Sequence, residues 1–387
     1  MRLRSTLALL PLLAVAATAS AQDTGSFVVR LGNDTTSVEG FTRTPQRLEV
    51  DQVGRVPRVL QRRFVYDFGP NGATTRASAL ITAPGAAAGA PPVQQIDVSV
   101  AGDSATVTIK QDTTTRVLRV GTPAGTLVAS NSAPWSIFEG QTVKLAAQKG
   151  ADSLRVPMYL FGAPNLSSLT VRRLGRDSMV IQTANDRYHA KVDAAGHIQG
   201  STPISGTQKY SADRVARLDL PAMAAAWSAR EKASGAMGQL STRDTVSATL
   251  AGASLWVDYS RPAKRGRVIF GNVVPYGELW RTGANAATQF KTDKNLQFGS
   301  VKVPAGFYTL FTIPAPNGWQ LIINGETGQP GTQHNAEKDL FKIPMKVSAL
   351  SEPVERFTIS VAPGEGGGVL NLDWDTTRAS VSFAVVP

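Results

Sequence analysis

The sequence contains no cysteine, and this absence excludes several kinds of structure. A chain without thiols forms no disulfide, carries no lipid on an amino-terminal cysteine and binds no metal through thiolates. Histidine is also scarce, since only His189, His197 and His334 occur. No H-E-x-x-H or comparable spacing is present, so we predict no metal site and no cofactor. The fold must be stabilised by packing alone.

Long hydrophobic runs are equally rare. The longest extends from Leu7 to Ala17, follows two arginines and precedes the tripeptide Ala19-Ser20-Ala21. It spans about ten residues, half of the roughly 20 that a membrane-spanning helix needs. A basic start, a short apolar run and a small-x-small site are typical of a secretory signal peptide, here residues 1–21 with cleavage after Ala21. We therefore expect a periplasmic or secreted protein without a transmembrane segment.

Motifs for catalysis are missing too. The sequence has no G-x-S-x-G elbow, and the glycine-rich residues 363–368 lack the spacing of a phosphate loop. Asp373 and Asp375 flank Trp374 and share one face of a strand, as a glycosidase pair or a Ca²⁺ site would require. The favoured interpretation is that both are solvated carboxylates opposite a buried tryptophan. We predict no catalytic residue, and an enzyme is the less favoured class.

Acidic residues are few relative to basic ones, which leaves a formal net charge of +11. Most of the excess falls before residue 244, where the arginines are scattered through strand-like segments. A nucleic-acid reader would cluster its cations on one face and interleave them with aromatics. We therefore predict no nucleic-acid partner, and a basic surface with weak affinity for anionic polymers or lipid headgroups.

What the sequence does have is alternation. Residues 64–68, 96–100, 106–109 and 117–120 alternate apolar and polar side chains between glycine, proline and asparagine turns, which predicts antiparallel strands. The same pattern returns after Thr245 with more aromatics and about nine strands. The predicted fold is mostly β: an amino-terminal curved sheet or sandwich and a carboxy-terminal β-sandwich, joined by one α-helix.

The helix is predicted where the alternation stops. Residues 218–239 are rich in alanine, with Asp219 placed as a cap, Pro221 in the first turn and Gly235 near the end. The predicted domains after the signal peptide are therefore 22–210 (amino-terminal β domain), 211–243 (helical linker) and 244–387 (carboxy-terminal sandwich).

The richest constellation of side chains is the stretch YGELWRTGANAATQF, residues 276–290. Arg281 offers a planar fork for a carboxylate or phosphate, Asn285 can donate and accept, and Trp280 and Tyr276 present flat faces. We expect Pro275 to start a helical turn that ends at Leu279. These residues form the candidate binding site for a small anionic or carbohydrate ligand.

A structural role for the same residues is the favoured alternative. In it, Arg281 pairs with Asp258 or Glu278, Trp280 fills the core, and Asn285 ties its own turn.

A second candidate segment, residues 258–271, adds Tyr259 and Arg261 to the cationic side chains of Lys264, Arg265 and Arg267. A loop with four cations is usually a solvated rim. Beside Arg281, however, it could form one positive pocket mouth, with His334 from residues 328–339 above it. Tyr259, Arg261 and His334 therefore complete the candidate site.

Residues 258–290, with VPAGFYTLFTIP, GWQLIIN, EPVERFTISV and LNLDWDTTRASV, resemble the bacterial secreted family called domain of unknown function 2911. The resemblance covers about residues 244–387, and the run from Tyr276 to Asn285 is its most specific part. It implies an exported, β-rich domain with no established activity. Where the family often shows Gln-Trp-Gly followed by a tyrosine, this sequence has Gln329-Pro330-Gly331 and then His334.

Four functions remain open, and the least specific of them is that both domains only scaffold an envelope assembly. The preferred one is an exported envelope protein whose carboxy-terminal domain is a non-catalytic binding or interaction module for an envelope protein, a lipid or a small ligand. The first alternative is a hydrolase of envelope polymers, which needs a cleft with two carboxylates. The second is a carrier, in which the amino-terminal sheet holds an apolar ligand against inward residues such as Phe64, Tyr66 and Phe68.

Overall fold

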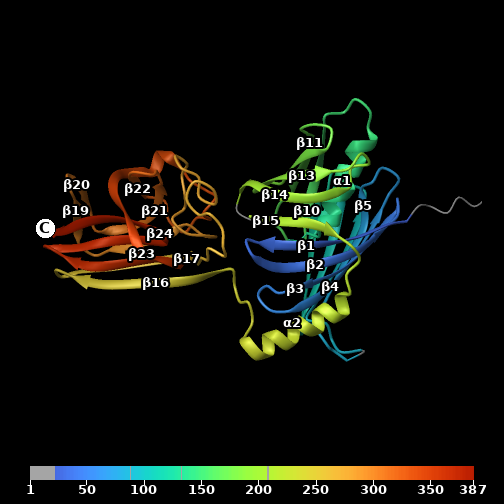
Figure 1. Cartoon of the computed structure of the whole chain (residues 1–387), viewed down its shortest axis with the longest axis horizontal. Coiled ribbons are helices and arrows are strands. Elements are labelled where there is room, and N and C mark those ends of the chain that lie inside the picture. The colour runs from blue at the N-terminus through green and yellow to red at the C-terminus, as the bar shows by residue number, and fades with distance from the viewer. Residues whose placement is uncertain (1–21, 88, 132, 207–208) are drawn as a thin grey trace, which may run out of the picture.

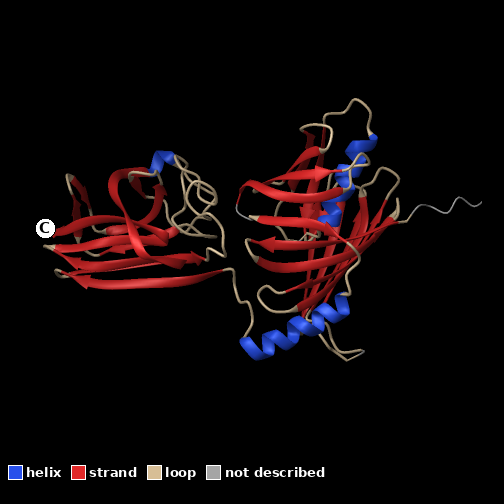
Figure 2. Cartoon of the chain, viewed as in Figure 1, coloured by secondary structure: helices blue, strands red, loops and turns tan. Residues whose placement is uncertain are grey.

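The computed structural model describes residues 22–387 except 88, 132, 207 and 208, so the predicted signal peptide, residues 1–21, lies outside the described residues. Two sheets and two α-helices make up most of the described chain (Figures 1 and 2). The larger sheet belongs to the amino-terminal half and the smaller to the carboxy-terminal half, with a helix between them. The predicted mostly β class is confirmed.

The amino-terminal sheet has 15 strands in the order β8-β7-β6-β5-β4-β3-β2-β1-β15-β14-β13-β12-β11-β10-β9. Every neighbouring pair is antiparallel except β9 with β10. The strands are β1 (Asp23–Leu31), β2 (Asp34–Arg43), β3 (Arg47–Gly54), β4 (Leu60–Phe68), β5 (Thr74–Thr82), β6 (Gln94–Ala101), β7 (Ser104–Gln111), β8 (Thr114–Gly121), β9 (Leu127–Ala129), β10 (Ser153–Leu160), β11 (Ser167–Arg173), β12 (Ser178–Gln182), β13 (Asp186–Val192), β14 (Ile198–Gly206) and β15 (Tyr210–Val215).

This sheet curves strongly, and one of its ends lies against its own inner face. The Thr74 N–H of β5 donates to the Thr126 carbonyl oxygen beside β9 (3.1 Å), and the Val128 N–H donates to Thr74 Oγ1 (3.0 Å). Phe64 and Tyr66 of β4 are buried in the core that the curve encloses, and Phe68 is partly buried against it. Period-two alternation places these residues on one face, as the sequence predicts.

Helix α1 (Trp135–Ala147) is a feature that the sequence analysis misses, since only strands are expected in this half. The helix lies inside the curve. The carboxylate of Glu39 on β2 accepts N–H groups from Trp135 (3.1 Å) and Ser136 (2.9 Å), and the ring of Trp135 packs on Tyr188 of β13. Because α1 contacts strands that are distant in the sheet, the sheet must wrap around it.

Helix α2 (Leu220–Ser234) confirms the predicted helix. Asp219 caps it by accepting the Ala222 N–H (2.9 Å), Pro221 lies in the first turn, and Gly235 ends it with a φ of 82°. Its inner side packs on Val38 and Val53 at the outer face of β2 and β3. Figure 1 shows α2 below the larger sheet, leading into the strands of the smaller one.

The carboxy-terminal sheet has nine strands in the order β16-β17-β18-β21-β22-β23-β24-β19-β20. The strands are β16 (Ser241–Leu250), β17 (Ala253–Pro262), β18 (Thr288–Thr292), β19 (Asn295–Phe298), β20 (Val301–Val303), β21 (Gly306–Ile313), β22 (Trp319–Asn324), β23 (Asp339–Gly364) and β24 (Gly367–Val386), with a single 3₁₀ turn, η1 (Ala336–Lys338).

The long strands β23 and β24 allow this single sheet to fold over. Val257 of β17, Ile323 of β22, Phe357 of β23 and Trp374 of β24 belong to one buried cluster, although they come from both ends of the strand order. Tyr259 Oη accepts the Ile359 N–H (3.0 Å) and so ties β17 to β23. The result is sandwich-like, with two layers over a common core. In the described part of the chain, no helix is long and apolar enough to cross a membrane.

Candidate functional site

The candidate site is a cleft of about 590 Å³ between the two halves of the chain, which we call the interdomain cleft. The amino-terminal half contributes Asn185, Lys209 and Tyr210, among others. The carboxy-terminal half contributes the loops that precede β18 and follow β22. Figure 1 shows these loops at the end of the smaller domain that faces the larger sheet.

The two domains contact each other directly beside the cleft, through the turn between β1 and β2 and the segment around Arg265. The Asn33 N–H in the turn between β1 and β2 donates to the Arg265 carbonyl oxygen (3.0 Å), and the Arg265 guanidinium pairs with Asp34. Gly32 (φ 60°) lies beneath this contact, where a Cβ atom would stand 2.1 Å from the Arg265 oxygen. The docking therefore requires a glycine at this turn.

Trp280 forms one wall of the cleft and is also part of the core. Its indole ring is half-buried and contacts Phe270, Trp319, Phe357 and Trp374 at centroid separations between 4.9 and 6.2 Å. Its Nε1–H donates to the Gly283 carbonyl oxygen (3.1 Å). The expected helical turn from Pro275 to Leu279 is wrong: Gly277 has a φ of 76°, outside the helical range, and its N–H donates to the Pro314 carbonyl oxygen (2.9 Å). Trp280 then bridges to Thr312 of β21 by two backbone hydrogen bonds.

Arg281 lines the cleft, and the expectation that it pairs with Asp258 or Glu278 is wrong. Asp258 pairs with Arg243 (2.6 Å), and among the described residues Arg281 has no ion pair within 4 Å. Its Nε is buried without a hydrogen-bond partner. Burial lowers the pKa of Arg281, and the Asp186 carboxylate across the domain boundary partly offsets that effect. The guanidinium thus keeps unused donors beside a cavity.

Asn285 stands at the rim with an exposed side chain, and its φ of 60° makes it a turn residue. The turn is tied by its backbone and not by its amide, because the Asn285 carbonyl oxygen accepts the Gly331 N–H (2.9 Å). Gly331 leaves room for Arg281: a Cβ atom there would lie 2.2 Å from Arg281 Cδ and 2.5 Å from the Asn285 oxygen. Gly331, the residue after the departing Pro330, therefore lies directly against Arg281.

His334 also lines the cleft, as the sequence suggests. Its Nε2 lies 2.8 Å from Asp339 Oδ1, and its ring packs edge-on against Phe311 at a centroid separation of 4.8 Å. Because Asp339 already contacts this imidazole nitrogen, His334 shapes the wall of the cleft and offers no free Nε2 to a ligand.

Tyr276, Tyr259 and Arg261 are not brought to the cleft. Tyr276 is exposed and covers Gly271, whereas Tyr259 is buried in the core. Each nitrogen of the Arg261 guanidinium donates a hydrogen bond: Nε to the Phe357 carbonyl oxygen (3.2 Å), Nη1 to Asp244 Oδ2 (2.9 Å) and Nη2 to Thr358 Oγ1 (2.9 Å). None of the three lines the cleft.

Of the four cations in the segment 258–271, Arg267 is the one that lines the cleft. Lys264 pairs with Asp375 (2.5 Å), and Arg265 pairs with Asp34. Lys209 of the other half is a cleft residue that sequence reasoning missed. It follows β14 and is brought to Arg281 only by the docking of the two domains, so no local signal could reveal it.

The electrostatic balance of the cleft is positive. Lys209, Arg267 and Arg281 line it, whereas Glu278 is the one carboxylate among the lining residues that the structure describes. Burial lowers the pKa of Lys209, and the carboxylates of Glu278 and Asp186 partly offset this lowering. Burial also lowers the pKa of Arg267. Cations in a partly desolvated cleft attract an anion more strongly than cations on an open surface do.

Asp373 and Asp375 form no catalytic pair. Asp373 makes a two-pronged contact with Arg378 (2.7 and 2.6 Å), and Asp375 is held by Lys264. Trp374 between them is buried, as expected, but Asp373 is buried as well, so its predicted solvation is wrong. In the described part of the chain, no group of three or more His, Asp or Glu side chains is placed to hold a metal ion.

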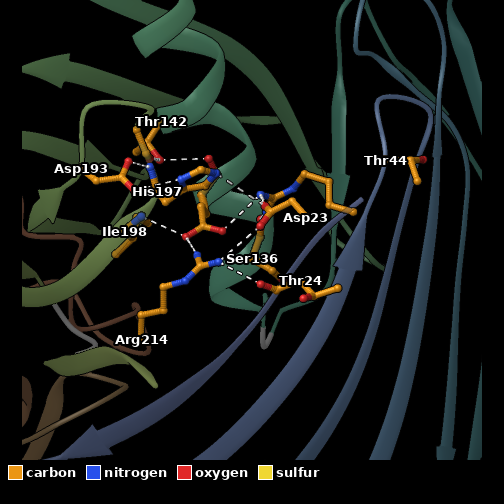
Figure 3. Close-up of polar contacts among 12 residues, drawn as sticks. Asp23, Thr24, Thr44, Ser136, Thr142, Asp193, His197, Ile198 and Arg214 are labelled. Atoms are coloured by element: carbon orange, nitrogen blue, oxygen red, sulfur yellow. Dashed lines mark hydrogen bonds and ion pairs between the residues drawn. The ribbon is translucent and has the colours of Figure 1, made fainter. Parts of the chain in front are cut away.

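A second charged cluster surrounds Glu139 on α1 (Figure 3). Its carboxylate, which has no exposed surface, pairs with Arg43 (3.1 Å) and Arg214 and accepts the Ile198 N–H (2.9 Å). His197 Nδ1 lies 3.0 Å from Asp193 Oδ2 in the same cluster. The charges satisfy one another, so the cluster anchors α1 inside the sheet and offers no open position for a ligand.

Comparison with known proteins supports the sequence resemblance. Residues 241–383 match the family described as protein of unknown function (DUF2911). No curated protein matches the chain.

Among solved structures, a DUF1089 family protein from Pseudomonas aeruginosa is similar over 44% of this chain and 90% of its own, with 13% identity and a TM-score of 0.31. A beta-barrel-like protein of the family DUF1849 from Brucella abortus is similar over 50% of this chain and 95% of its own, with 13% identity and a TM-score of 0.33.

Proposed function

We propose that this is an exported envelope protein that binds a small anionic molecule, such as a carboxylate, a phosphate or an acidic sugar, in the interdomain cleft without transforming it. The observation that carries the proposal is Arg281, which lines the cleft and which, among the residues that the structure describes, has no ion pair and no hydrogen-bond partner for its buried Nε. Leaving a buried donor unsatisfied costs about 1–3 kcal/mol. A ligand anion would recover that cost.

The neighbours of Arg281 suit such a ligand. Lys209 and Arg267 add charge, the exposed amide of Asn285 can donate or accept at the rim, and half-buried Trp280 offers apolar contact. An arginine fork binds a carboxylate or a phosphate through two parallel hydrogen bonds. Asp186 reduces the positive potential but lies outside the lining of the cleft.

The hydrolase alternative is less well supported. Glycoside hydrolysis needs two cooperating carboxylates. Among the described residues, Glu278 is the one carboxylate that lines the cleft. Asp373 and Asp375 form ion pairs with Arg378 and Lys264. We therefore favour binding over catalysis.

The test is anion binding by the full-length mature chain, measured by calorimetry with inorganic phosphate, citrate and glucuronate. We expect Arg281→Ala to weaken the tightest of these at least about tenfold, as the loss of a charge-assisted hydrogen bond predicts. Gly331→Ala should act in the same direction, because its methyl group displaces Arg281.

The matched control is Arg243→Ala, which removes an exposed arginine of the same domain that pairs with Asp258 and does not line the cleft. It should leave affinity unchanged. Equal affinity in folded Arg281→Ala and the wild type, or no binding of any of the three anions, would refute the proposal.

Export is tested separately by expressing the complete chain in a Gram-negative host and sequencing the amino terminus of the protein in the periplasmic fraction. The expected mature terminus is Gln22. Recovery of the chain only from the cytoplasm with residues 1–21 retained would contradict export.

A further inference from the structure

A second hollow lies on the inner face of the amino-terminal sheet, with a volume of about 650 Å³; we call it the inner groove. Its floor is an apolar row that crosses four adjacent strands, because Phe64, Ala79, Ile96 and Ile109 are successive register partners. Four strands spaced by about 4.8 Å make this row about 14 Å long. Phe161, which precedes the loop after β10, faces it from the opposite side.

The inner groove exists because the sheet curls without closing. The end of the sheet that contains β4 to β8 extends past the other end, which contains β9 and β10. The two ends approach each other at Gly162, which follows β10: a Cβ atom there would lie 3.3 Å from Ile109 Cδ1 on β7. A smaller hollow of about 290 Å³ continues inward, and both hollows are lined by Arg62, Ser130 and Asn131. Arg62 therefore stands where the open groove meets the interior.

Arg62 and Arg63 are adjacent on β4 but point to opposite faces, as strand geometry requires. Outward Arg63 is exposed and pairs with Glu49 (2.8 Å) and Asp51 (3.0 Å). Inward Arg62 has no carboxylate within 4 Å among the described residues, and its one hydrogen bond is a long contact to Gln52 Oε1 (3.4 Å). Burial lowers the pKa of Arg62, and no neighbouring anion offsets it.

Gly54 on β3 is shaped to accept the guanidinium of Arg62. A Cβ atom at Gly54 would lie 2.0 Å from Arg62 Nη1. The φ of Gly54 is not in the left-handed region, so the backbone there does not require glycine. The missing side chain is explained by the space that the guanidinium occupies, which holds Arg62 against the sheet at the end of the apolar row.

We propose that the inner groove binds a linear amphiphile with one anionic head, of the fatty carboxylate class, with the head on Arg62 and the chain along the row from Phe64 to Ile109. An unpaired inward cation beside a continuous apolar floor complements such a molecule in charge and in shape. The length of the row matches a chain of medium length. This site is independent of the interdomain cleft, and it narrows the carrier hypothesis from any apolar ligand to an anionic one.

The test uses the full mature chain and a fluorescent fatty acid, displaced in turn by dodecanoate, dodecylamine and butyrate. Dodecanoate should displace the probe. Dodecylamine has the chain without the negative charge and butyrate the charge without the chain, so both should be at least about tenfold weaker. Arg62→Met should weaken dodecanoate about tenfold, whereas Arg63→Met, the adjacent outward arginine, should not change it.

If Arg62→Met does not fold, as judged by its circular dichroism spectrum, Gly54→Ala serves instead, because it keeps the charge and displaces the guanidinium. The proposal is overturned if dodecanoate fails to displace the probe. It is also overturned if dodecanoate and dodecylamine compete equally, or if the folded Arg62 or Gly54 variant binds dodecanoate as the wild type does. Retained dodecanoate binding in Arg281→Ala separates this site from the interdomain cleft.

Discussion

Glu39 carries the least expected chemistry of any single residue. Its carboxylate has no exposed surface, and burial raises its pKa to about 7, although the N–H groups of Trp135 and Ser136 oppose the shift. The folded protein therefore holds this proton at pH values where the unfolded chain, with an ordinary glutamate pKa near 4.5, has released it. Glu39 thus contributes stability below pH 4.5 that is lost as the pH rises through 7.

Glu39→Gln should remove this dependence. Between pH 4.5 and 7, the free energy of unfolding of the wild type should fall relative to that of the variant by up to about 3 kcal/mol. Urea denaturation at several pH values measures the difference. Glu49→Gln is the control, since contact with Arg47 lowers the pKa of this outward residue and confines its effect to acidic pH. A constant difference between wild type and Glu39→Gln from pH 4.5 to 7 would contradict the prediction.

Residue-level expectations from sequence succeeded where the signal was local. Trp280, Arg281, Asn285 and His334 all line the interdomain cleft, and the first three lie within six consecutive residues. Their role in binding a ligand stays a prediction. The expected partner of Arg281 was wrong because Asp258 is engaged by Arg243 on the neighbouring strand, a pairing set by the register of β16 and β17. Lys209 was missed because only tertiary docking brings it near.

Among the elements, the two helices show which signals a sequence carries. Helix α2 was predicted because Asp219, Pro221 and Gly235 are contiguous with it. Helix α1 has no local cap: its first N–H groups are received by Glu39, which lies 96 and 97 residues earlier. It is also buried on several sides, so no polar stripe marks its period. Burial and a distant cap together conceal such a helix.

The anchoring of α1 by Glu139 can be measured. Glu139→Ala leaves Arg43 and Arg214 partly buried with only Asp23 as a shared partner, and we expect a loss of about 3–5 kcal/mol in the free energy of unfolding. Asp213→Ala, which breaks the exposed pair with Arg30, should cost only about 0–1 kcal/mol. Denaturant titrations of both variants measure these free energies of unfolding. If both variants lose a similarly small amount of stability, the cluster does not anchor the helix.

At the scale of the whole molecule, alternation predicted two β domains because period two specifies strands with one buried face. It identified the buried pair Phe64 and Tyr66 correctly. It could not reveal that the first sheet curls or that the second folds over, since curvature depends on which strands meet across the core. The positions of the interdomain cleft and of the inner groove follow from that geometry, so neither could be located from the sequence.

The docking of the two domains depends on a very small contact. Gly32, at the turn between β1 and β2, lies under the carbonyl oxygen of Arg265, and an added methyl group would stand 2.1 Å from it. Gly32→Ala should therefore force the domains apart while leaving each core intact. We expect a larger radius of gyration by small-angle X-ray scattering and faster proteolysis of residues 235–240, which connect α2 to β16.

Backbone strain alone must be separated from the loss of docking, because Gly32 has a φ of 60° that alanine tolerates poorly. Gly252→Ala provides this control: its φ is 79°, its added methyl group meets nothing within 4 Å, and it lies in the hairpin between β16 and β17. It should lower stability by about 1 kcal/mol without changing the radius of gyration. If Gly32→Ala keeps the wild-type radius and protease resistance, the turn does not hold the domains together. If it separates them, anion binding in the interdomain cleft should weaken as well, because Lys209 and Arg281 lie on opposite sides of it.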